Sequence, residues 1–258
     1  MILYFSGAGN SKYVALKAAE ATQDNLVSIV DCAKNQRFSF DLKKGESLGI
    51  VTPVYFSGLP TIVDEFLGKL SVNAEEKPYV YLVATCGASS GSVDVYLKRH
   101  LKRIGLELSA GFCVNMPDTW TVIFSVNNKK KINKKLHRAE SKINEILLKI
   151  KNQERGSFMK LKFPMFISNI MRKIYEKARS TKHFVVASSC EGCGQCAQNC
   201  PAEAIQIQSN RPVWVKEKCV MCLGCLHTCP NFAIQYGEKT KYHGQYCHPY
   251  FKSETLKA

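Results

Sequence analysis

The sequence predicts an α/β domain built on a doubly wound parallel sheet, followed by a small α+β domain. Two observations support this prediction. Over residues 1 to about 150, short apolar runs alternate with helical stretches, and such alternation is typical of a parallel sheet with helices on both faces. Residues 190–230 then hold eight of the twelve cysteines in two similar runs, which indicates a compact second unit that binds metal.

The elements of the first domain, residues 1–152, follow from the apolar periodicity. Strands are predicted at residues 2–5, 26–30, 48–54, 79–84 and 108–114. Helices are predicted at residues 12–22, 61–70, 92–104 and 132–150,. The last helix has its apolar side chains in one stripe and lysines and arginines elsewhere. A helix of this kind packs one face on a sheet and leaves the other in water.

A linker is predicted at residues 153–185, and Pro164 begins or interrupts a helix within it. Residues 129–182 carry 17 basic and 4 acidic side chains, which account for most of the formal net charge of +15. This stretch is either an amphipathic connector between the domains or a patch for a membrane surface or an acidic partner. The second domain is predicted at residues 186–237 and a C-terminal tail at residues 238–258.

Three loops that each follow a predicted strand are rich in glycine, hydroxyl and aromatic side chains. Loop 1 contains Ser6, Gly7, Ala8, Gly9, Asn10 and Ser11. Loop 2 contains Pro53, Val54, Tyr55, Phe56, Ser57 and Gly58. Loop 3 spans residues 85–91 and contains Thr85, Cys86, Gly87, Ala88, Ser89 and Gly91. We expect one binding site here, because the carboxyl ends of parallel strands meet at the same edge of an open sheet.

The composition of these loops suits a flavin nucleotide. Backbone N–H groups, hydroxyls and the start of the following helix make loop 1 suitable for a phosphate. Loops 2 and 3 suit a flat ring held by backbone hydrogen bonds, with Tyr55 or Phe56 available for stacking.

The three loops together resemble those of the flavodoxin family across residues 1 to about 150. This resemblance implies a five-stranded sheet of order 2-1-3-4-5, with the phosphate of FMN on loop 1 and its ring between loops 2 and 3. Two positions depart from the family. Ala8 stands where flavodoxins commonly have a threonine, and loop 3 lacks the aromatic side chain that usually covers the second ring face. Trp120 either supplies that cover or only packs on its own loop.

The two cysteine runs repeat each other at a distance of 29 residues, and a proline follows each run. The first contains Cys190, Cys193, Cys196 and Cys200, and the second contains Cys219, Cys222, Cys225 and Cys229. Three closely spaced thiolates and a fourth from elsewhere are what a 4Fe-4S cube requires. A pair of zinc ribbons is the alternative, although zinc sites typically use two separate Cys-x2-Cys pairs.

Residues 186–237 resemble a bacterial two-cluster ferredoxin domain, which would bind two 4Fe-4S clusters. In this pattern the fourth cysteine of each run ligates the cluster of the other run. One predicted ligand set is therefore Cys190, Cys193, Cys196 and Cys229, and the other is Cys219, Cys222, Cys225 and Cys200.

The whole chain is similar to the flavodoxin–ferredoxin fusion proteins of anaerobic bacteria and archaea. The resemblance implies an electron-transfer protein that passes electrons between two 4Fe-4S clusters and FMN, and so links one-electron with two-electron carriers. The alternative is an FMN-dependent iron–sulfur reductase that acts on a small molecule. No positioned acid or base supports the alternative, and no catalytic residue is predicted.

Expectations about partners follow from charge and composition. The basic stretch is expected to dock acidic redox proteins. A redox sensor that contacts nucleic acid is a third hypothesis, but residues 129–182 contain no recognised nucleic-acid-binding module, so no nucleic acid is expected. No apolar run reaches the roughly 18 to 20 residues of a membrane span, and the N-terminal residues do not resemble an export signal. We therefore expect a cytoplasmic protein, with peripheral membrane contact as a further option.

Overall fold

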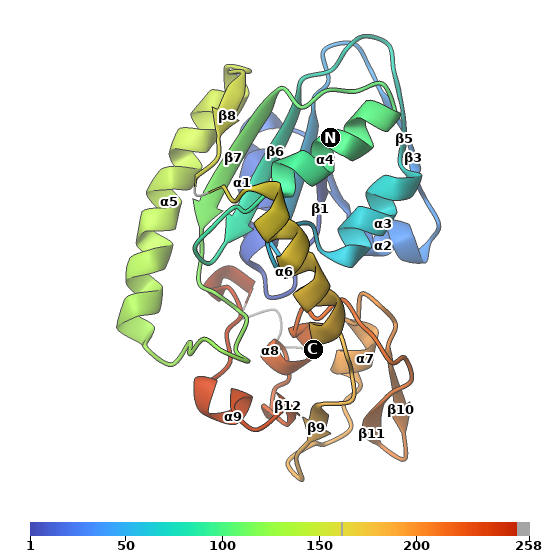
Figure 1. Ribbon diagram of the computed structural model, residues 1–258, viewed down its shortest axis with the longest axis vertical. Coiled ribbons are helices and arrows are strands. Elements are labelled where there is room, and N and C mark those ends of the chain that lie inside the picture. Colours follow the sequence, from blue (N-terminus) through green and yellow to red (C-terminus); the bar gives the residue numbers. More distant parts are fainter. Residues whose placement is uncertain (161, 252–258) are drawn as a thin grey trace.

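The computed structural model describes residues 1–160 and 162–251, and Figure 1 shows an α/β domain stacked on a smaller C-terminal domain. The α/β domain contains a six-stranded sheet of order β2-β1-β4-β6-β7-β8, in which every neighbouring pair is parallel. Its strands are β1 (Ile2–Tyr4), β2 (Leu26–Ser28), β4 (Leu48–Pro53), β6 (Val80–Cys86), β7 (Ala110–Asn115) and β8 (Gly156–Phe158).

Helices cover both faces of this sheet (Figure 1). One face carries α2 (Ile29–Lys34), α3 (Thr61–Lys69) and α4 (Val93–Arg103), and the other carries α1 (Asn10–Thr22) and α5 (Lys129–Lys151). Alternate strand residues supply the two cores: Ile50 lies in the first and Val51 in the second, because successive strand side chains point to opposite faces. The predicted doubly wound α/β class is confirmed.

The sheet differs from the prediction in detail. Numbered in chain order among themselves, β1, β2, β4, β6 and β7 have the order 2-1-3-4-5, but β8 adds a sixth strand beside β7. Two further strands, β3 (Ser39–Leu42) and β5 (Ser71–Ala74), form a separate parallel pair. All three unpredicted strands have three or four residues, which is too short to produce a recognisable periodicity.

The C-terminal domain consists of short elements arranged around the cysteines. Strand β9 (Phe184–Val186) pairs with β12 (Ile234–Tyr236), and β10 (Ile205–Gln208) pairs with β11 (Arg211–Trp214), both in antiparallel fashion. The helices are α7 (Gln195–Gln198), α8 (Gly224–His227) and α9 (Thr240–His243). Its small core includes several of the cysteines themselves.

The segments predicted as linker and tail are largely folded. The linker residues supply β8, helix α6 (Met165–Ala178), which begins directly after Pro164, and most of β9. Beyond α9 the chain returns to loop 1, where the Tyr246 hydroxyl donates to Asn10 Oδ1 at 2.7 Å and the His248 N–H donates to the Ala8 carbonyl at 2.9 Å. Residues 252–258 of the predicted tail lie outside the described residues. Within the described part of the chain, no helix has the length and apolar character needed to cross a membrane.

Candidate functional site

A cavity of about 320 Å³ lies at the carboxyl edge of the sheet, and all three predicted loops line it. Their lining residues are Ser6, Gly7, Ala8, Asn10, Ser11, Pro53, Val54, Tyr55, Phe56, Ser57, Thr85, Cys86, Gly87, Ala88 and Ser89. Three predicted glycines do not line it: Gly9 faces His248, Gly58 pairs with Tyr55, and Gly91 packs on loop 2. The structure thus brings the loops together as expected, while the role of each residue in binding stays a prediction.

Loop 1 places the start of α1 at this cavity. Gly9 adopts a φ of 92° as the N-cap of this 13-residue helix, and its N–H donates to Ser6 Oγ at 3.1 Å. The Ser11 and Thr85 hydroxyls lie 2.7 Å apart and join loop 1 to loop 3. The start of a helix presents backbone N–H groups, and together with nearby hydroxyls it can bind the phosphate of a nucleotide.

Glycine permits close packing between loops at two positions of the cavity wall. A Cβ atom on Gly87 would overlap the Asp118 carboxylate, and one on Gly7 would lie 2.9 Å from both the Cys222 carbonyl oxygen and the Tyr55 hydroxyl. The absence of a side chain therefore lets loops 1 and 3 pack directly against these neighbours. Together with the hydroxyls and the helix start, this arrangement fits FMN.

The wall formed by loop 2 is a strained turn. Phe56 and Ser57 have φ values of 45° and 70°, a region that costs most residues free energy and is adopted only where the surroundings impose it. Two hydrogen bonds between Tyr55 and Gly58, of 2.9 and 3.0 Å, close the turn. Trp120 lies edge-on to Phe56 with ring centroids 5.3 Å apart and also lines the cavity, so an aromatic pair borders the space for a flat ring.

Several lining residues were not identified from the sequence: Met116, Pro117, Asp118, Thr119, Ile123, Phe124, Met171, Met221 and Cys222. Residues 116–119 follow the fifth predicted strand, so the same edge rule could have found them. Met171 and Met221 come from α6 and from the second domain, and no local pattern signals their approach.

The eight cysteines form two sets of four, each around its own small cavity. One cavity is lined by Cys190, Cys193, Cys196 and Cys229, and the other by Cys200, Cys219, Cys222 and Cys225. These are the two sets expected from the crossed pairing. That they ligate metal stays a prediction.

Backbone N–H groups point at the cysteine sulfurs. The Ala204 N–H lies 3.3 Å from Cys200 Sγ, and the Ala233 N–H lies at the same distance from Cys229 Sγ in the other repeat. Burial raises the pKa of the Cys196 and Cys219 thiols to about 11, so a cation is needed to hold them as thiolates at neutral pH. Thiols with N–H donors in an apolar shell are the donor set of an iron–sulfur cluster.

The two kinds of site share a wall, because Cys222 lines both the large cavity and one cysteine cavity. Its carbonyl and Cβ are the atoms against which loop 1 packs at Gly7. A Cβ atom on Gly224 would in turn lie 3.1 Å from the Gly7 carbonyl oxygen. The second domain therefore forms part of the site that the loops of the first domain create.

Comparison with known protein families identifies both domains. A family model described as a flavodoxin domain matches residues 1–144, which is more than half of the chain. The chain belongs to the flavodoxin family. A second model, described as a 4Fe-4S dicluster domain, matches residues 182–230 and selects iron–sulfur over the zinc alternative. This flavodoxin–ferredoxin fusion is therefore an FMN and iron–sulfur redox protein.

Two solved structures are similar to the chain. Rubredoxin oxygen:oxidoreductase from the anaerobe Desulfovibrio gigas has 15% identity and a TM-score of 0.34, over 58% of this chain and 36% of that chain. The Trp repressor binding protein from Bacillus subtilis has 14% identity and a TM-score of 0.35, over 56% of this chain and 96% of that chain. The chain thus spans about a third of the length of the first structure. A comparison with curated proteins found no match.

We expect the contact between loop 1 and the chain segment beyond α9 to be sensitive to pH, because this segment contains the buried His248. Its ring is 6% exposed and stacks on Tyr13 at 4.2 Å, and burial lowers its pKa to about 4 from the usual 6.5. Between these values the unfolded chain binds a proton that the folded chain does not, so stability present above pH 6.5 is lost as the pH falls toward 4.

We therefore expect acidification from pH 7.5 to 5.5 to lower the urea midpoint of unfolding more for the natural protein than for His248→Phe. Every other titrating group is common to the two proteins and cancels in the comparison. The same decrease in both would show that His248 does not contribute.

Proposed function

We propose that this protein transfers electrons between FMN in the large cavity and two 4Fe-4S clusters held by the two cysteine sets. Bound FMN can exchange one or two electrons, whereas each cluster exchanges one. The observation that carries the proposal is that Cys222 lines both the flavin cavity and a cysteine cavity. Because one chain holds both sites, exchange between them does not depend on an encounter.

The residues between the sites exclude water. Val220, Met221 and Leu223 are each less than 5% exposed. Loop 1 would hold the FMN phosphate, while Tyr55, Phe56 and Trp120 would border the ring. Buried apolar neighbours keep a low dielectric around both sites, and this strengthens every fixed dipole aimed at them.

The two cysteine sets differ in their position along this route. The set with Cys222 adjoins the flavin cavity, whereas the other contains Cys193, which is exposed at the surface. We assign the first set to a flavin-proximal cluster and the second to an outer cluster nearer the surface. Clusters of this kind need reduced thiols, which is why we place the protein in the cytoplasm of an anaerobic cell.

The test is a reductive titration of protein purified without oxygen, which should contain about eight iron atoms and one FMN per chain. After addition of less than one equivalent of a one-electron reductant, visible and electron paramagnetic resonance spectra should show electrons distributing between flavin and clusters. The rate constant of electron exchange between flavin and clusters should be the same at all protein concentrations, because the exchange is intramolecular. A rate proportional to concentration would contradict the proposal.

A second function, an FMN-dependent reductase acting on a small molecule, is favoured by one observation. Asp118 lines the flavin cavity, and burial raises the pKa of its carboxyl group, which is the property of a general acid. Steady-state turnover of small acceptors that falls in Asp118→Asn, while exchange between flavin and clusters is unchanged, would establish this activity. Absence of turnover with a panel of acceptors would exclude these substrates.

For the partner, we propose an acidic redox protein that docks on the outer face of α6. Phe166, Ile170 and Ile174 are 65%, 55% and 46% exposed on this face, and the exposed Lys173 and Lys177 lie among them. An apolar centre with a charged rim is the usual anatomy of a transient interface. The same helix reaches the flavin cavity through Met171, so a partner bound there would lie close to the flavin.

Electron exchange with such a partner should slow as salt is added, because salt screens the attraction between exposed charges. Lys173→Glu/Lys177→Glu should reduce the rate at low salt. Lys43→Glu/Lys44→Glu makes the same change of charge at exposed positions of a distant loop and should have little effect. Equal losses in the two double variants would contradict the docking site, and binding to anionic vesicles instead would assign the face to a membrane.

A further inference from the structure

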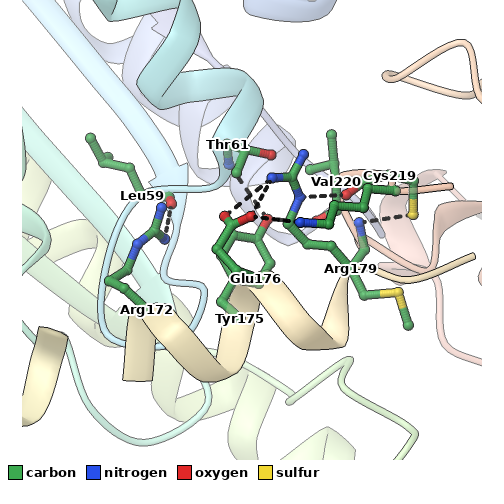
Figure 2. Close-up of polar contacts among 10 residues, drawn as sticks. Leu59, Thr61, Arg172, Tyr175, Glu176, Arg179, Cys219 and Val220 are labelled. Atoms are coloured by element: carbon green, nitrogen blue, oxygen red, sulfur yellow. Dashed lines mark hydrogen bonds and ion pairs between the residues drawn. The ribbon is translucent and has the colours of Figure 1, made fainter. Parts of the chain in front are cut away.

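Side chains at the C-terminal half of α6 contact both domains. Figure 2 shows them reaching Leu59 and Thr61, which follow loop 2, and the cluster loop at Cys219 and Val220. We propose that Tyr175 is a positioning residue whose hydroxyl fixes the loop of the flavin-proximal cluster against loop 2 of the flavin cavity. This inference rests on the proposed electron transfer. It adds a residue that lines neither cavity but sets how the two face each other.

The contacts on the cluster side are short. The Tyr175 hydroxyl donates to the Val220 carbonyl at 2.6 Å, and Arg179 Nε donates to the Cys219 carbonyl at 2.9 Å. Tyr175 is fully buried, and burial raises its pKa to about 12, so the hydroxyl remains a donor at neutral pH. Two consecutive carbonyls of the cluster loop, one of them that of a predicted ligand, are therefore held by α6 (Figure 2).

The contacts on the flavin side are made by the same ring. Phe56 stacks on Tyr175 with centroids 5.3 Å apart and planes 20° apart, and Tyr55 meets it edge-on at 6.1 Å. Both Phe56 and Tyr55 line the flavin cavity. The Tyr175 hydroxyl also accepts from the Thr61 N–H at 3.4 Å, so one oxygen is bonded to both domains.

The flavodoxin domain fixes α6 independently of Tyr175. The buried Ser168 hydroxyl lies 2.9 Å from that of Ser57 in loop 2 and 2.7 Å from that of Ser92, which follows loop 3. Arg172 donates to the Leu59 carbonyl at 2.6 Å (Figure 2). Because these bonds set the position of the helix, the Tyr175 hydroxyl transmits that position to the cluster loop.

The test is Tyr175→Phe in the full chain with both kinds of cofactor bound. The ring and its stacking remain, but the Val220 carbonyl loses its donor inside the protein, which is costly for a buried group. We expect exchange between flavin and clusters to slow, because the cluster loop is no longer held at a fixed position against loop 2. The electron paramagnetic resonance signal of one cluster should change while that of the other stays the same, and amide exchange should increase at residues 219–224.

Tyr81→Phe is the matched control, because the Tyr81 hydroxyl is buried and has no hydrogen-bond partner within the described residues. It should leave the rate and both cluster signals unchanged. Arg179→Met, which removes the donor to the Cys219 carbonyl, should act in the same direction as Tyr175→Phe. It provides the test if Tyr175→Phe loses its clusters. The inference would be overturned if Tyr175→Phe protein with all its cofactors bound had the same exchange rate and the same cluster signals as the natural protein. If the natural protein itself exchanged no electrons between its sites, the proposed function would fail, whereas the cluster signal and amide exchange would still report on positioning.

Discussion

Replacement of Cys200 by alanine is expected to remove about four of the eight iron atoms and to weaken FMN binding at the same time. Cys200 belongs to the first repeat, but the structure groups it with the three cysteines of the second. Without it, the loop that contains Cys222 loses the metal that orders it, since so small a core depends on metal ligation. Loop 1 packs against this loop at Gly7, so FMN affinity should also fall. We expect a decrease of about tenfold or more, which corresponds to roughly 1.4 kcal/mol of binding free energy.

Iron content and fluorescence titration with FMN measure the two effects. Cys32→Ala is the matched control, because Cys32 is equally buried but lies in the core of the flavodoxin domain. It should keep all the iron. If Cys200→Ala bound FMN as tightly as the natural protein, the two sites would be independent of each other despite their shared wall.

Gly7→Ala is expected to cause the second large loss of FMN affinity. The added Cβ would lie 2.9 Å from the Cys222 carbonyl oxygen and from the Tyr55 hydroxyl, and 3.0 Å from Cys222 Cβ. Backbone atoms cannot move aside as the end of a flexible side chain can. Overpacking of this kind costs about 1–3 kcal/mol, which corresponds to a roughly 5- to 150-fold weaker affinity if the flavin site absorbs the displacement.

Gly68→Ala is a control in which the same substitution should stabilise the protein instead of disturbing its packing. Gly68 lies within α3, and a Cβ there would meet no atom within 4 Å. The change should leave FMN affinity as it is and stabilise the protein by about 0.5–1 kcal/mol, because alanine favours a helix interior. A similar loss of FMN affinity in both variants would mean that Gly7 acts through general stability and not through its contact with the second domain.

Local sequence patterns were sufficient to predict the parallel sheet, its main helices and the edge at which the three loops meet. Alternating apolar runs predicted the sheet, because a strand and a helix each impose their own periodicity on the side chains that they bury. The three loops met at one edge because parallel strands all end there. The spacing of the cysteines predicted two cluster loops, since a cubane cluster imposes a fixed spacing on its ligands. The resemblance to two-cluster ferredoxins implied which four cysteines form each set.

Contacts between segments far apart in the chain could not be predicted in this way. Nothing near Met171 indicates that it lines a flavin cavity, and nothing near Cys222 indicates that it lies in two walls at once. The phenolic oxygen of Tyr175 has partners at residues 61 and 220, and such contacts depend on how complementary surfaces pack, not on a repeating pattern. The return of the chain to loop 1 is of the same kind, and the sequence prediction treated that stretch only as a tail.

That return has a consequence for biosynthesis. Asn10 and Tyr246 are 236 residues apart yet share a hydrogen bond, so loop 1 leaves the ribosome well before the segment that contacts it. Contacts of such high sequence separation form late, because the whole intervening chain must be ordered before they gain any stability. The eight cysteines that we predict to bind iron lie between these two residues in the sequence. We therefore expect newly made chains to acquire their iron before they retain flavin, and a shortage of iron in the cell to yield protein that lacks both cofactors.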